Sequence, residues 1–464
     1  MIQKYFGPDK TYSFVNSNEK TNSHDNIYTV LIGKNGTGKS RLLKSLIENF
    51  MGPTNHNGFY SSKRKEFIDT GKVEATDVPK NIIAISTSPF DKFPIYNYRE
   101  VEDERYSYLG LRNLNSSDLG KAYMSNIFLS LITSIIRDNQ DIQKILNVLN
   151  YLGYEKNLQA NYRLEINRIK MREVFDSSNP VETFINIFLR KRTSSAIRIN
   201  LNFFKINGRD DEAEFDTGKV EFFLELYSRY FLYTKGRIVT IGISASGIDI
   251  NLDGIDFLNE FLFLLETRIF RLTNILIRKC GSYDVLDIGE ASSGEQSVVM
   301  SILGIASKIK NKSLVCIDEP EVCLHPEWQE KYINILMKTF KDYSGCHFII
   351  ATHSPLIVSS LADDNCFILS MANATIKNAS EINKKSVDFQ LANVFDTPGF
   401  KNEYLMREFI TILTMFGANE QIDDLQIRTI KDLLKLKEVL SDKDPVKKLM
   451  IMAEEILEEN FNDT

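Results

Sequence analysis

The sequence predicts an α/β fold in which a mostly parallel sheet is covered by helices on both faces. Three observations predict it. Short, nearly continuous apolar runs occur near the start of the chain and again after residue 310. A glycine-rich turn follows one of these runs and an adjacent pair of acids follows another. Helical periodicity dominates the long segment between the two blocks and the last part of the chain.

The expected strands are nearly continuous apolar runs. Such runs, unlike alternating ones, fit strands of a parallel sheet that is buried on both faces. They are Ile27–Ile32, Ile82–Ser86, Leu314–Ile317, His347–Ala351 and Cys366–Leu369. Because they come before and after the helical segment, we expect both ends of that segment to lead into one sheet.

The middle of the chain, residues 101–280, is predicted to be a mainly helical insertion or lid. It lacks the sustained heptads of a long coiled coil. A glycine-containing run, Ile238–Asp253, predicts a β-hairpin within it. The expected helices are Ile127–Leu149, Val181–Leu189, Val220–Leu232 and Phe257–Ile277.

The segment after residue 377 is also predicted to be helical. Near its end, apolar residues recur at the spacing of one helix face. These residues are Leu449, Met452, Ala453 and Ile456.

The composition excludes several classes of protein. The chain has 464 residues, 43% hydrophobic and 25% charged, which suits a soluble globular protein of two or three domains. Its net charge of −6 excludes a polycation that coats nucleic acid. The five cysteines form no CxxC pair, so we expect a reducing, cytoplasmic compartment and no zinc site. No signal peptide or run of about 18 apolar residues is seen, so we expect no membrane span.

The first expected strand is followed by a complete phosphate-binding loop, Gly33-Lys34-Asn35-Gly36-Thr37-Gly38-Lys39-Ser40. Backbone N–H groups can converge on a phosphate chain only where side chains are small or absent. Lys39 is expected to contact the β- and γ-phosphates, and the Ser40 hydroxyl to bind Mg²⁺. A helical stretch follows and adds the positive end of its dipole. The residues expected to hold the nucleotide are Gly33, Asn35, Gly36, Thr37, Gly38, Lys39 and Ser40. A chance glycine turn is the alternative, and the flanking strand and helix disfavour it.

The third expected strand ends in two adjacent acids, Asp318 and Glu319, which is the Walker B pattern. Asp318 is expected to hold Mg²⁺ directly or through water, and Glu319 to act as the general base on the attacking water. One acid after a buried strand is often only a turn. The phosphate-binding loop elsewhere in the chain favours the catalytic interpretation.

Two further motifs accompany these. Ser292-Ser293-Gly294-Glu295-Gln296 precedes a helical stretch about twenty residues before Asp318. By itself it is a good helix N-terminus with an acid in the first turn. His353 follows the fourth expected strand immediately. A lone histidine at a strand end is more often structural than functional.

Together these motifs resemble the ABC superfamily of ATPases, in the branch of RecF, SMC and overcoming-lysogenisation-defect proteins. The resemblance covers roughly residues 27–52, 81–93 and 287–360. It implies ATP and Mg²⁺ as cofactors and a head-to-tail dimer in which a signature motif contacts the γ-phosphate held by the other subunit. Ser293, Gly294 and Gln296 match that signature, whereas Ser292 and Glu295 replace its leucine and second glycine. His353 matches the histidine that senses the γ-phosphate.

Under this resemblance, residues 1–100 and 281–376 are the two parts of one ABC-type domain, with residues 101–280 inserted and residues 377–464 as a helical segment. Two positions keep alternatives open. Asp91 lies where the family has a glutamine, and either coordinates metal or water or is a structural turn residue. His325, in Glu319-Pro320-Glu321-Val322-Cys323-Leu324-His325-Pro326, either bridges the dimer or caps a helix. Tyr12 and Phe14 are candidates to stack on adenine.

The pieces Leu31–Gly36, Ser86–Phe93 and Tyr108–Arg112 look most like the ATPase subunit of Septu and retron-associated antiphage systems, with the PARIS ATPase as a close rival. This resemblance implies a regulatory scaffold that controls a separate HNH-type nuclease. No acidic triad at the Toprim nuclease spacing follows residue 377. The alternative is a RecF-like DNA repair ATPase, for which the basic clusters Lys63-Arg64-Lys65 and Arg190-Lys191-Arg192, with Arg198, are the candidate contacts. A subunit of a membrane transporter is disfavoured by the altered signature.

Overall fold

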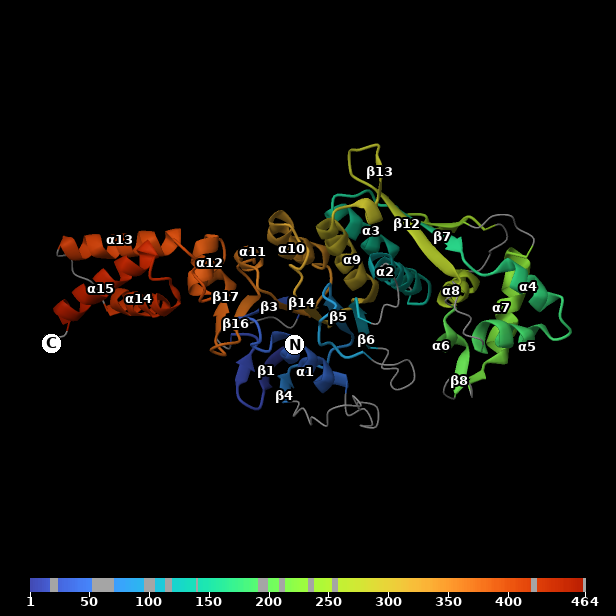
Figure 1. Cartoon of the computed structure of the whole chain (residues 1–464), viewed down its shortest axis with the longest axis horizontal. Helices are drawn as coiled ribbons and strands as arrows, with labels where there is room; N and C mark the ends of the chain where they lie inside the picture. Colours follow the sequence, from blue (N-terminus) through green and yellow to red (C-terminus); the bar gives the residue numbers. More distant parts are fainter. Residues whose placement is uncertain are drawn as a thin grey trace.

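The computed structural model describes residues 1–16, 24–51, 71–95, 105–112, 119–138, 141–190, 199–207, 213–232, 238–252, 258–418 and 424–461. These parts form an elongated molecule (Figure 1). A parallel sheet with its covering helices lies in the middle. The insertion extends from one side of it, and the C-terminal helices extend from the other.

The central sheet has seven strands in the order β17-β16-β3-β15-β14-β5-β6. Neighbouring strands from β16 to β6 are parallel, and β17 is antiparallel to β16. All five expected strands are present, and β6 and β17 were not predicted. In sheet order, the strands are Ile376–Asn378, Cys366–Ser370, Ile27–Ile32, His347–Ala351, Leu314–Asp318, Ile82–Ser86 and Tyr106–Gly110.

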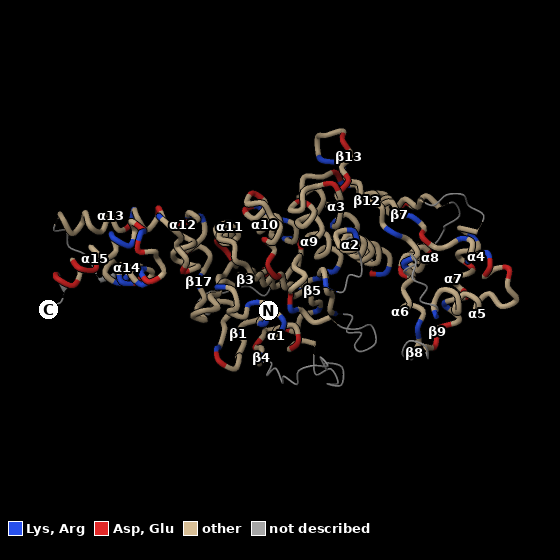
Figure 2. Tube along the Cα trace, viewed as in Figure 1, with Lys and Arg blue, Asp and Glu red and all other residues tan. Residues whose placement is uncertain are grey.

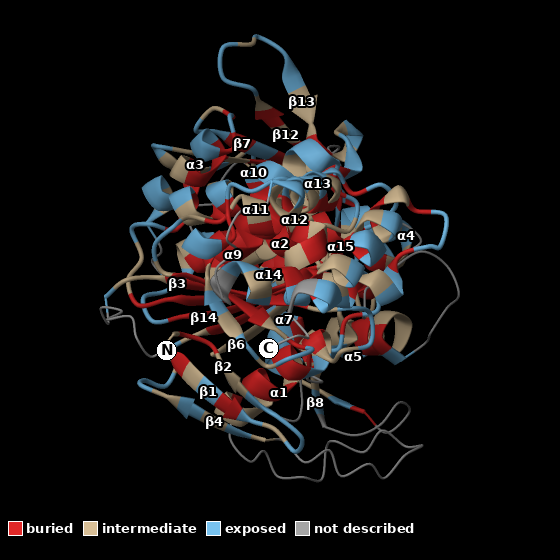
Figure 3. Cartoon of the chain, turned by 90° about the vertical axis from the view of Figure 1, so that its left-hand side faces the viewer, coloured by how far each residue is buried: buried red, intermediate tan, exposed pale blue. Residues whose placement is uncertain are grey.

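The four inner strands β3, β15, β14 and β5 are buried along their whole length because both faces are covered (Figure 3). Alternate residues of β14 point to opposite faces. Leu314 and Cys316 pack with the layer that contains α1 (Lys39–Met51), and Val315 and Ile317 pack with the layer that contains α9 (Ser293–Lys308). The α1 layer also contains the small antiparallel sheet β2-β1-β4, and the α9 layer contains further helices. Their bounds are Thr11–Ser13, Ile2–Phe6 and Lys72–Ala75 for the strands, and Pro326–Thr339 for α10 and Pro355–Ser359 for α11.

The described part of the insertion contains more helical than strand residues, together with a sheet of which only the hairpin was predicted. It carries a five-stranded antiparallel sheet in the order β11-β10-β7-β12-β13. The hairpin expected at 238–253 is present as β10 and β11. The strands, in chain order, are Leu158–Leu164, Ile238–Ser244, Gly247–Ile250, Phe270–Arg278 and Val285–Asp287.

The helix expected over Phe257–Ile277 is wrong in its second half. The helix α8 spans Leu258–Glu266, and strand β12 starts at Phe270 after Arg268 adopts a positive φ of 59°. Along β12, buried and less buried residues alternate, with one shift between Leu272 and Asn274. This period of two is that of a half-buried strand rather than a helix. The sequence pattern was apolar enough to suit either period.

The long helix expected at Ile127–Leu149 is two helices, α2 (Leu119–Ile136) and α3 (Ile142–Tyr151). The Asp141 side chain accepts a hydrogen bond from the N–H of Gln143 and thereby begins α3. The helices expected near 181–189 and 220–232 are present, with shifted bounds. The remaining elements of the insertion are α4 (Arg168–Phe175), α5 (Pro180–Phe184) continued by a π-helical turn (Ile185–Arg190), α6 (Leu201–Phe204), β8 (Lys205–Asn207), β9 (Glu214–Phe215) and α7 (Thr217–Tyr230).

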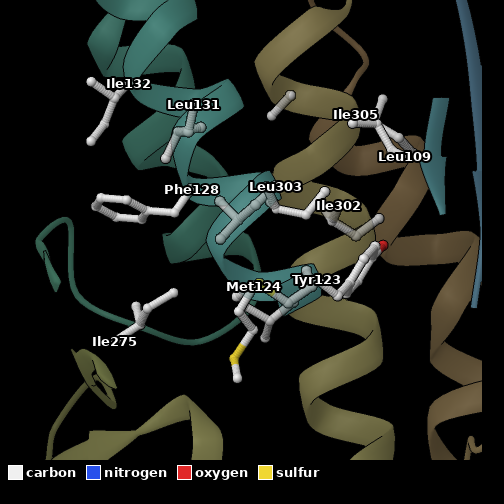
Figure 4. Close-up of a cluster of buried hydrophobic side chains, with 14 of the residues drawn as sticks. Leu109, Tyr123, Met124, Phe128, Leu131, Ile132, Ile275, Ile302, Leu303 and Ile305 are labelled. Carbon is white, nitrogen blue, oxygen red and sulfur yellow. The ribbon is translucent and has the colours of Figure 1, made fainter. Parts of the chain in front are cut away.

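Helix α2 packs against α9 through a continuous set of apolar side chains, which include Tyr123, Phe128 and Leu131 (Figure 4). A Cβ at Gly304 of α9 would lie 2.9 Å from Ile127, so glycine permits this close approach. Among the described helices, α2 alone is long and apolar enough to cross a membrane. In this structure 39% of the helix is buried, and its buried side chains pack with those of α9.

The C-terminal helices α12 (Val387–Asn393), α13 (Glu403–Gly417), α14 (Asp424–Leu434) and α15 (Pro445–Phe461) have a core of their own. The buried face of α15 is displaced from the predicted one. It contains Val446, Met450, Ala453 and Leu457, whereas Met452 is 51% exposed. Of the predicted set, Ala453 alone is fully buried.

Candidate nucleotide-binding site

The phosphate-binding loop joins β3 to α1 at the carboxyl edge of the central sheet. Gly36 and Gly38 have φ values of 81° and 95°, which residues with a side chain rarely adopt. At Gly33 a Cβ would lie 2.8 Å from the Thr37 hydroxyl oxygen. The glycines therefore permit the tight turn, which the Thr37 hydroxyl closes by donating to the Lys34 carbonyl at 2.9 Å.

Lys39 lies folded back over this loop. Its ammonium donates to the Gly33 carbonyl at 2.9 Å and contacts Nε2 of His353 at 2.6 Å. An ammonium can only donate, so Nε2 of His353 accepts and the imidazole is neutral. Burial, followed by the charge of Lys39, lowers the pKa of His353, and burial lowers the pKa of Lys39. The His353 imidazole therefore accepts one of the hydrogen bonds that the Lys39 ammonium can donate at the phosphate-binding loop.

Ser40 and Asp318 come together from α1 and β14. The Ser40 hydroxyl donates to the Asp318 carboxylate at 3.1 Å. Burial raises the pKa of Asp318 to about 7, helped by neighbouring Glu319 and opposed by the Ser40 hydrogen bond. Two adjacent oxygen donors, one of them a carboxylate removed from water, fit a hard divalent cation such as Mg²⁺. The structure thus places the two predicted metal ligands side by side.

Glu319 directly follows β14 with a φ of 49°. Its N–H donates to the Ala351 carbonyl at 2.9 Å, which ties the loop after β14 to the end of β15. Its carboxylate lies 3.7 Å from Nε2 of His353. The structure therefore brings Lys39, Glu319 and His353 into one cluster at the sheet edge.

Glu321 was not singled out from the sequence as a site residue. Its carboxylate accepts hydrogen bonds from the His353 N–H at 2.5 Å and the Thr352 hydroxyl at 2.8 Å. Burial raises its pKa. The position of a second acid two residues after Glu319 was visible in the sequence, but its contact with a loop 31 residues later was not.

The signature residues lie at the N-terminus of α9. Ser292 caps the helix by accepting from the Glu295 N–H at 3.2 Å, and Ser293 is exposed. The Gln296 amide donates to the carbonyls of Gly289 and Ala291 at 3.0 and 2.8 Å. Gln296 thus holds the turn that leads into the helix; Ser292 and Ser293 are both exposed, and the Ser292 hydroxyl is engaged in the cap.

Gly294 packs against the loop that follows Glu319. A Cβ at this position would lie 3.2 Å from the Cys323 carbonyl oxygen. The absence of a side chain here therefore serves packing within the protomer. Ser293 is for this reason the cleaner position at which to test a contact with a second protomer.

Glu295, which replaces the second glycine of the signature, faces the insertion. Its carboxylate accepts a hydrogen bond from the hydroxyl of buried Tyr154 and lies 3.2 Å from the ammonium of Lys279. Tyr154 and Lys279 are themselves bridge partners. The first turn of α9 is thus tied to the end of β12.

The contacts of Asp91 and His325 bear on their two possible roles each, metal coordination or turn residue for Asp91 and dimer contact or helix cap for His325. Both Asp91 oxygens are engaged: one with the Arg112 guanidinium at 2.9 Å and the Phe93 N–H at 3.0 Å, the other with the Tyr108 hydroxyl at 2.7 Å. These contacts favour the structural alternative. His325 caps α10 by accepting from the Glu327 N–H at 3.4 Å.

The two aromatic candidates for adenine stacking differ in exposure, since Tyr12 is partly exposed and Phe14 is not. Phe14 is fully buried against His347, and Tyr12 stacks on Tyr5. Of the basic clusters, residues 63–65, 191–192 and 198 lie outside the described residues, and Arg190 is exposed. Along the described part of the insertion, basic and acidic residues alternate along the chain trace (Figure 2).

Residues 126–359 match the family described as AAA domain, putative AbiEii toxin, Type IV TA system. This match covers half of the chain, which therefore belongs to that family and contains an ATPase domain of the AAA type. Asp318, Glu319, the α9 N-terminus and His353 fall inside the matched range, and the phosphate-binding loop precedes it.

Three curated relatives are similar to the chain. Protein ea59 of Escherichia phage lambda is 22% identical over 75% of this chain and 48% of its own length. The probable ATPases of retron Ec83 from Escherichia coli and retron Vc95 from Vibrio cholerae are each 32% identical over 95 residues, which is 18% of this chain. The chain spans about half of the phage protein and less than a fifth of each retron protein.

Among solved structures, similarity extends to an SMC head domain bound to the winged-helix domain of ScpA, with 13% identity over 81% of this chain and 96% of the other and a TM-score of 0.27. It also extends to the ATP-binding cassette of the transporter protein MJ1267, with 12% identity over 85% and 96% and a TM-score of 0.26.

Proposed function

We propose that the chain binds and hydrolyses ATP with Mg²⁺ and acts as the regulatory ATPase of an antiphage defence complex, in which nucleotide-dependent dimerisation controls a separate nuclease. The observation that supports the first part is the cluster at the carboxyl edge of the central sheet. Lys39, Ser40, Asp318, Glu319 and His353 meet there from three strands.

Each residue has a role that follows from its chemistry. Ser40 and Asp318 would hold Mg²⁺, which neutralises charge on the phosphates. Lys39 exchanges its hydrogen bond to His353 for the β- and γ-phosphates. Glu319 has a side chain that is 34% exposed, so water can reach this carboxylate and lose a proton to it. His353, released from Lys39, then donates to the γ-phosphate from the tautomer or charge state that carries a proton on Nε2.

The dimer is proposed from the exposed N-terminus of α9. A phosphate is favoured at such a helix end, where N–H groups and the helix dipole point outward. Ser293 of one protomer would face the γ-phosphate held by the other in a head-to-tail arrangement. The similarity of the chain to the probable ATPases of two retrons supports the defence setting.

Nucleotide binding alone supplies enough free energy to switch such an assembly. At a free ATP concentration of a hundred times the dissociation constant, each bound site stabilises the closed state by about 2.7 kcal/mol. Two sites give about 5 kcal/mol, close to the roughly 5.5 kcal/mol that converts a 1:99 population into 99:1. We therefore propose that ATP binding, more than steady turnover, sets the state of the nuclease.

The test is to purify the chain together with the product of its neighbouring gene and to titrate ATP while DNA cleavage is measured. We expect cleavage to change across micromolar to millimolar ATP and to become insensitive to ATP in the Lys39→Ala variant. Cleavage that is absent or indifferent to ATP would contradict the regulatory proposal. DNA-stimulated ATP turnover by the chain alone would instead support the RecF-like alternative.

A further inference from the structure

We propose that Glu321 is the positioning residue of the site: it fixes the backbone at His353 so that the imidazole reaches Lys39 and Glu319. This inference rests on the proposed ATPase activity. It concerns a residue for which the motifs assign no role, and it depends on contacts between two loops that are distant in sequence.

The first observation is the double contact of the Glu321 carboxylate. One oxygen accepts from the His353 N–H and the other from the Thr352 hydroxyl. Thr352 is itself fully buried, and its hydroxyl oxygen accepts from the Ser354 N–H at 3.0 Å. The loop 352–354 is therefore held by a charged acceptor at its centre, and hydrogen bonds to charged groups are stronger than neutral ones.

The second observation is that Gln329 of α10 joins the same two loops. The Gln329 amide donates to the Leu324 carbonyl at 2.9 Å, and its oxygen accepts from the Ser354 hydroxyl at 2.7 Å. Glu321 and Gln329 thus tie the same two loops together at two points. Gln329 holds the far end of loop 352–354, and Glu321 holds the residue that carries the imidazole.

The third observation is the conformation of the loop that carries Glu321. Both Glu319 and Cys323 have positive φ values, of 49° and 69°. Such backbone is costly for residues with side chains and persists where surrounding contacts hold it. Because of this turn, the Glu319 carboxylate lies near the His353 imidazole and the Glu321 carboxylate accepts from the His353 N–H. Both acids of the motif therefore contact one histidine.

The same loop also supports the signature helix, because Gly294 packs on the Cys323 carbonyl. A displacement of α9 in a dimer would therefore bear on the loop that holds His353. Of the two side chains that join these loops, Glu321 is the one that bonds the residue carrying the imidazole.

Three variants separate positioning from general stability. Glu321→Ala removes both acceptors. Glu321→Gln keeps an oxygen for the His353 N–H, and its amide can donate to the Thr352 hydroxyl oxygen. Glu327→Ala is the matched control, because Glu327 is exposed in the first turn of α10 and its carboxylate pairs with Lys331 at 2.5 Å.

Two readouts are measured on the full chain. Without nucleotide, hydrogen–deuterium exchange of a peptide covering residues 351–356 reports the His353 N–H. With ATP, kcat and the ATP dissociation constant are measured for each variant and for His353→Ala. We expect Glu321→Ala to lose exchange protection, to lower kcat about 10- to 100-fold, as expected for lost hydrogen bonds to a charged group, and to keep its ATP affinity within about threefold.

Glu321→Gln is expected to retain most of both properties, and Glu327→Ala to match the wild type. In the double variant with His353→Ala, Glu321→Ala should lower kcat no further, since it acts through that histidine. The proposal is overturned if Glu321→Ala leaves kcat unchanged, if its effect adds in full to that of His353→Ala, or if affinity and kcat fall together. A wild-type chain that hydrolyses no ATP instead refutes the proposed function, and this is seen before any variant is compared.

Discussion

The two ends of strand β15 carry a histidine each, and the two residues do different things. His347, at the start of the strand, is fully buried; its Nε2 lies 2.9 Å from the Thr29 hydroxyl, and its Nδ1 accepts from the Ile2 N–H at 3.3 Å. His353, just after the end, is partly exposed and contacts Lys39. At the amino end of β15, the histidine is buried and both of its ring nitrogens have protein partners. At the carboxyl end, the histidine is partly exposed and bonds a lysine that can bond phosphate instead.

The difference follows from how a parallel sheet is built. All strands that carry motifs end at the same edge, so the loops after them meet there and their polar groups are satisfied by each other or by a ligand. At the opposite edge, the N–H of Ile2 in β1 donates to His347 at the start of β15. Disruption of the carboxyl edge should therefore affect nucleotide chemistry, and disruption of the amino edge should affect stability.

The largest effect is expected from Lys39→Ala, which should abolish tight ATP binding. Each charge-assisted contact that is lost costs about 1.5–3 kcal/mol, so affinity should fall at least tenfold. Isothermal calorimetry measures this, with Lys34→Ala as the control because Lys34 is an exposed lysine in the same loop. An unchanged affinity in Lys39→Ala would refute the phosphate-binding assignment.

Glu319→Gln should stop turnover while ATP binding persists. The amide keeps the shape of the carboxylate but cannot accept the proton, and the loss of a general base costs about 10²- to 10⁴-fold. Dimers with bound ATP should then accumulate and be visible by analytical ultracentrifugation. Turnover at the wild-type rate would show that Glu319 is not the base.

Ser293→Arg should leave ATP affinity of the isolated protomer intact and lower turnover by about 10²-fold, as for the loss of one oxyanion-type donor. The exposed position of Ser293 predicts this separation. If affinity and turnover fall equally, the residue acts within its own protomer and the head-to-tail proposal loses its support.

His347 predicts a dependence of stability on pH without an effect on activity. Burial lowers its pKa to about 3, well below the usual value near 6.5. Between these values the unfolded chain binds the extra proton, so the free energy of unfolding decreases as pH falls below about 6.5. The loss should reach about 2 kcal/mol at pH 5. Denaturant unfolding at pH 7.5 and pH 5 measures it, and His347→Gln should flatten the slope; an equal slope in the variant would assign the effect elsewhere.

The smallest effect is expected from Tyr154→Phe, which removes the hydroxyl that the insertion offers to Glu295. A single hydrogen bond contributes about 1 kcal/mol, so turnover should change by no more than about fivefold and ATP affinity should stay constant. Tyr151→Phe, at an exposed tyrosine of α3, is the control. A variant that loses ATP affinity would show that the insertion supports the nucleotide site itself.

The parts of the site that the sequence predicted are those in which neighbours in the chain are neighbours in space. Strand β3, the glycine turn and Lys39 are contiguous, and so are strand β14 and Asp318. The failures have the opposite character. Phe270–Arg278 contains apolar residues that suit either period, and only pairing with β7 selects the strand. Glu321 and Glu295 are of a residue type that usually lies on the surface, and their hydrogen-bond partners are far away in the sequence.

The sequence by itself determined the strand runs of the central sheet, the glycine turn, the acidic pair and the chemistry that these residue types can perform. That is because short-range backbone geometry and burial on both faces leave a local pattern. Only the tertiary structure decided that the Lys39 ammonium bonds His353, that Glu321 holds the His353 backbone, and that Glu295 faces Tyr154. These contacts join loops and elements brought together by parallel strands and by the insertion, and side chains at such separations leave no periodic trace in the chain.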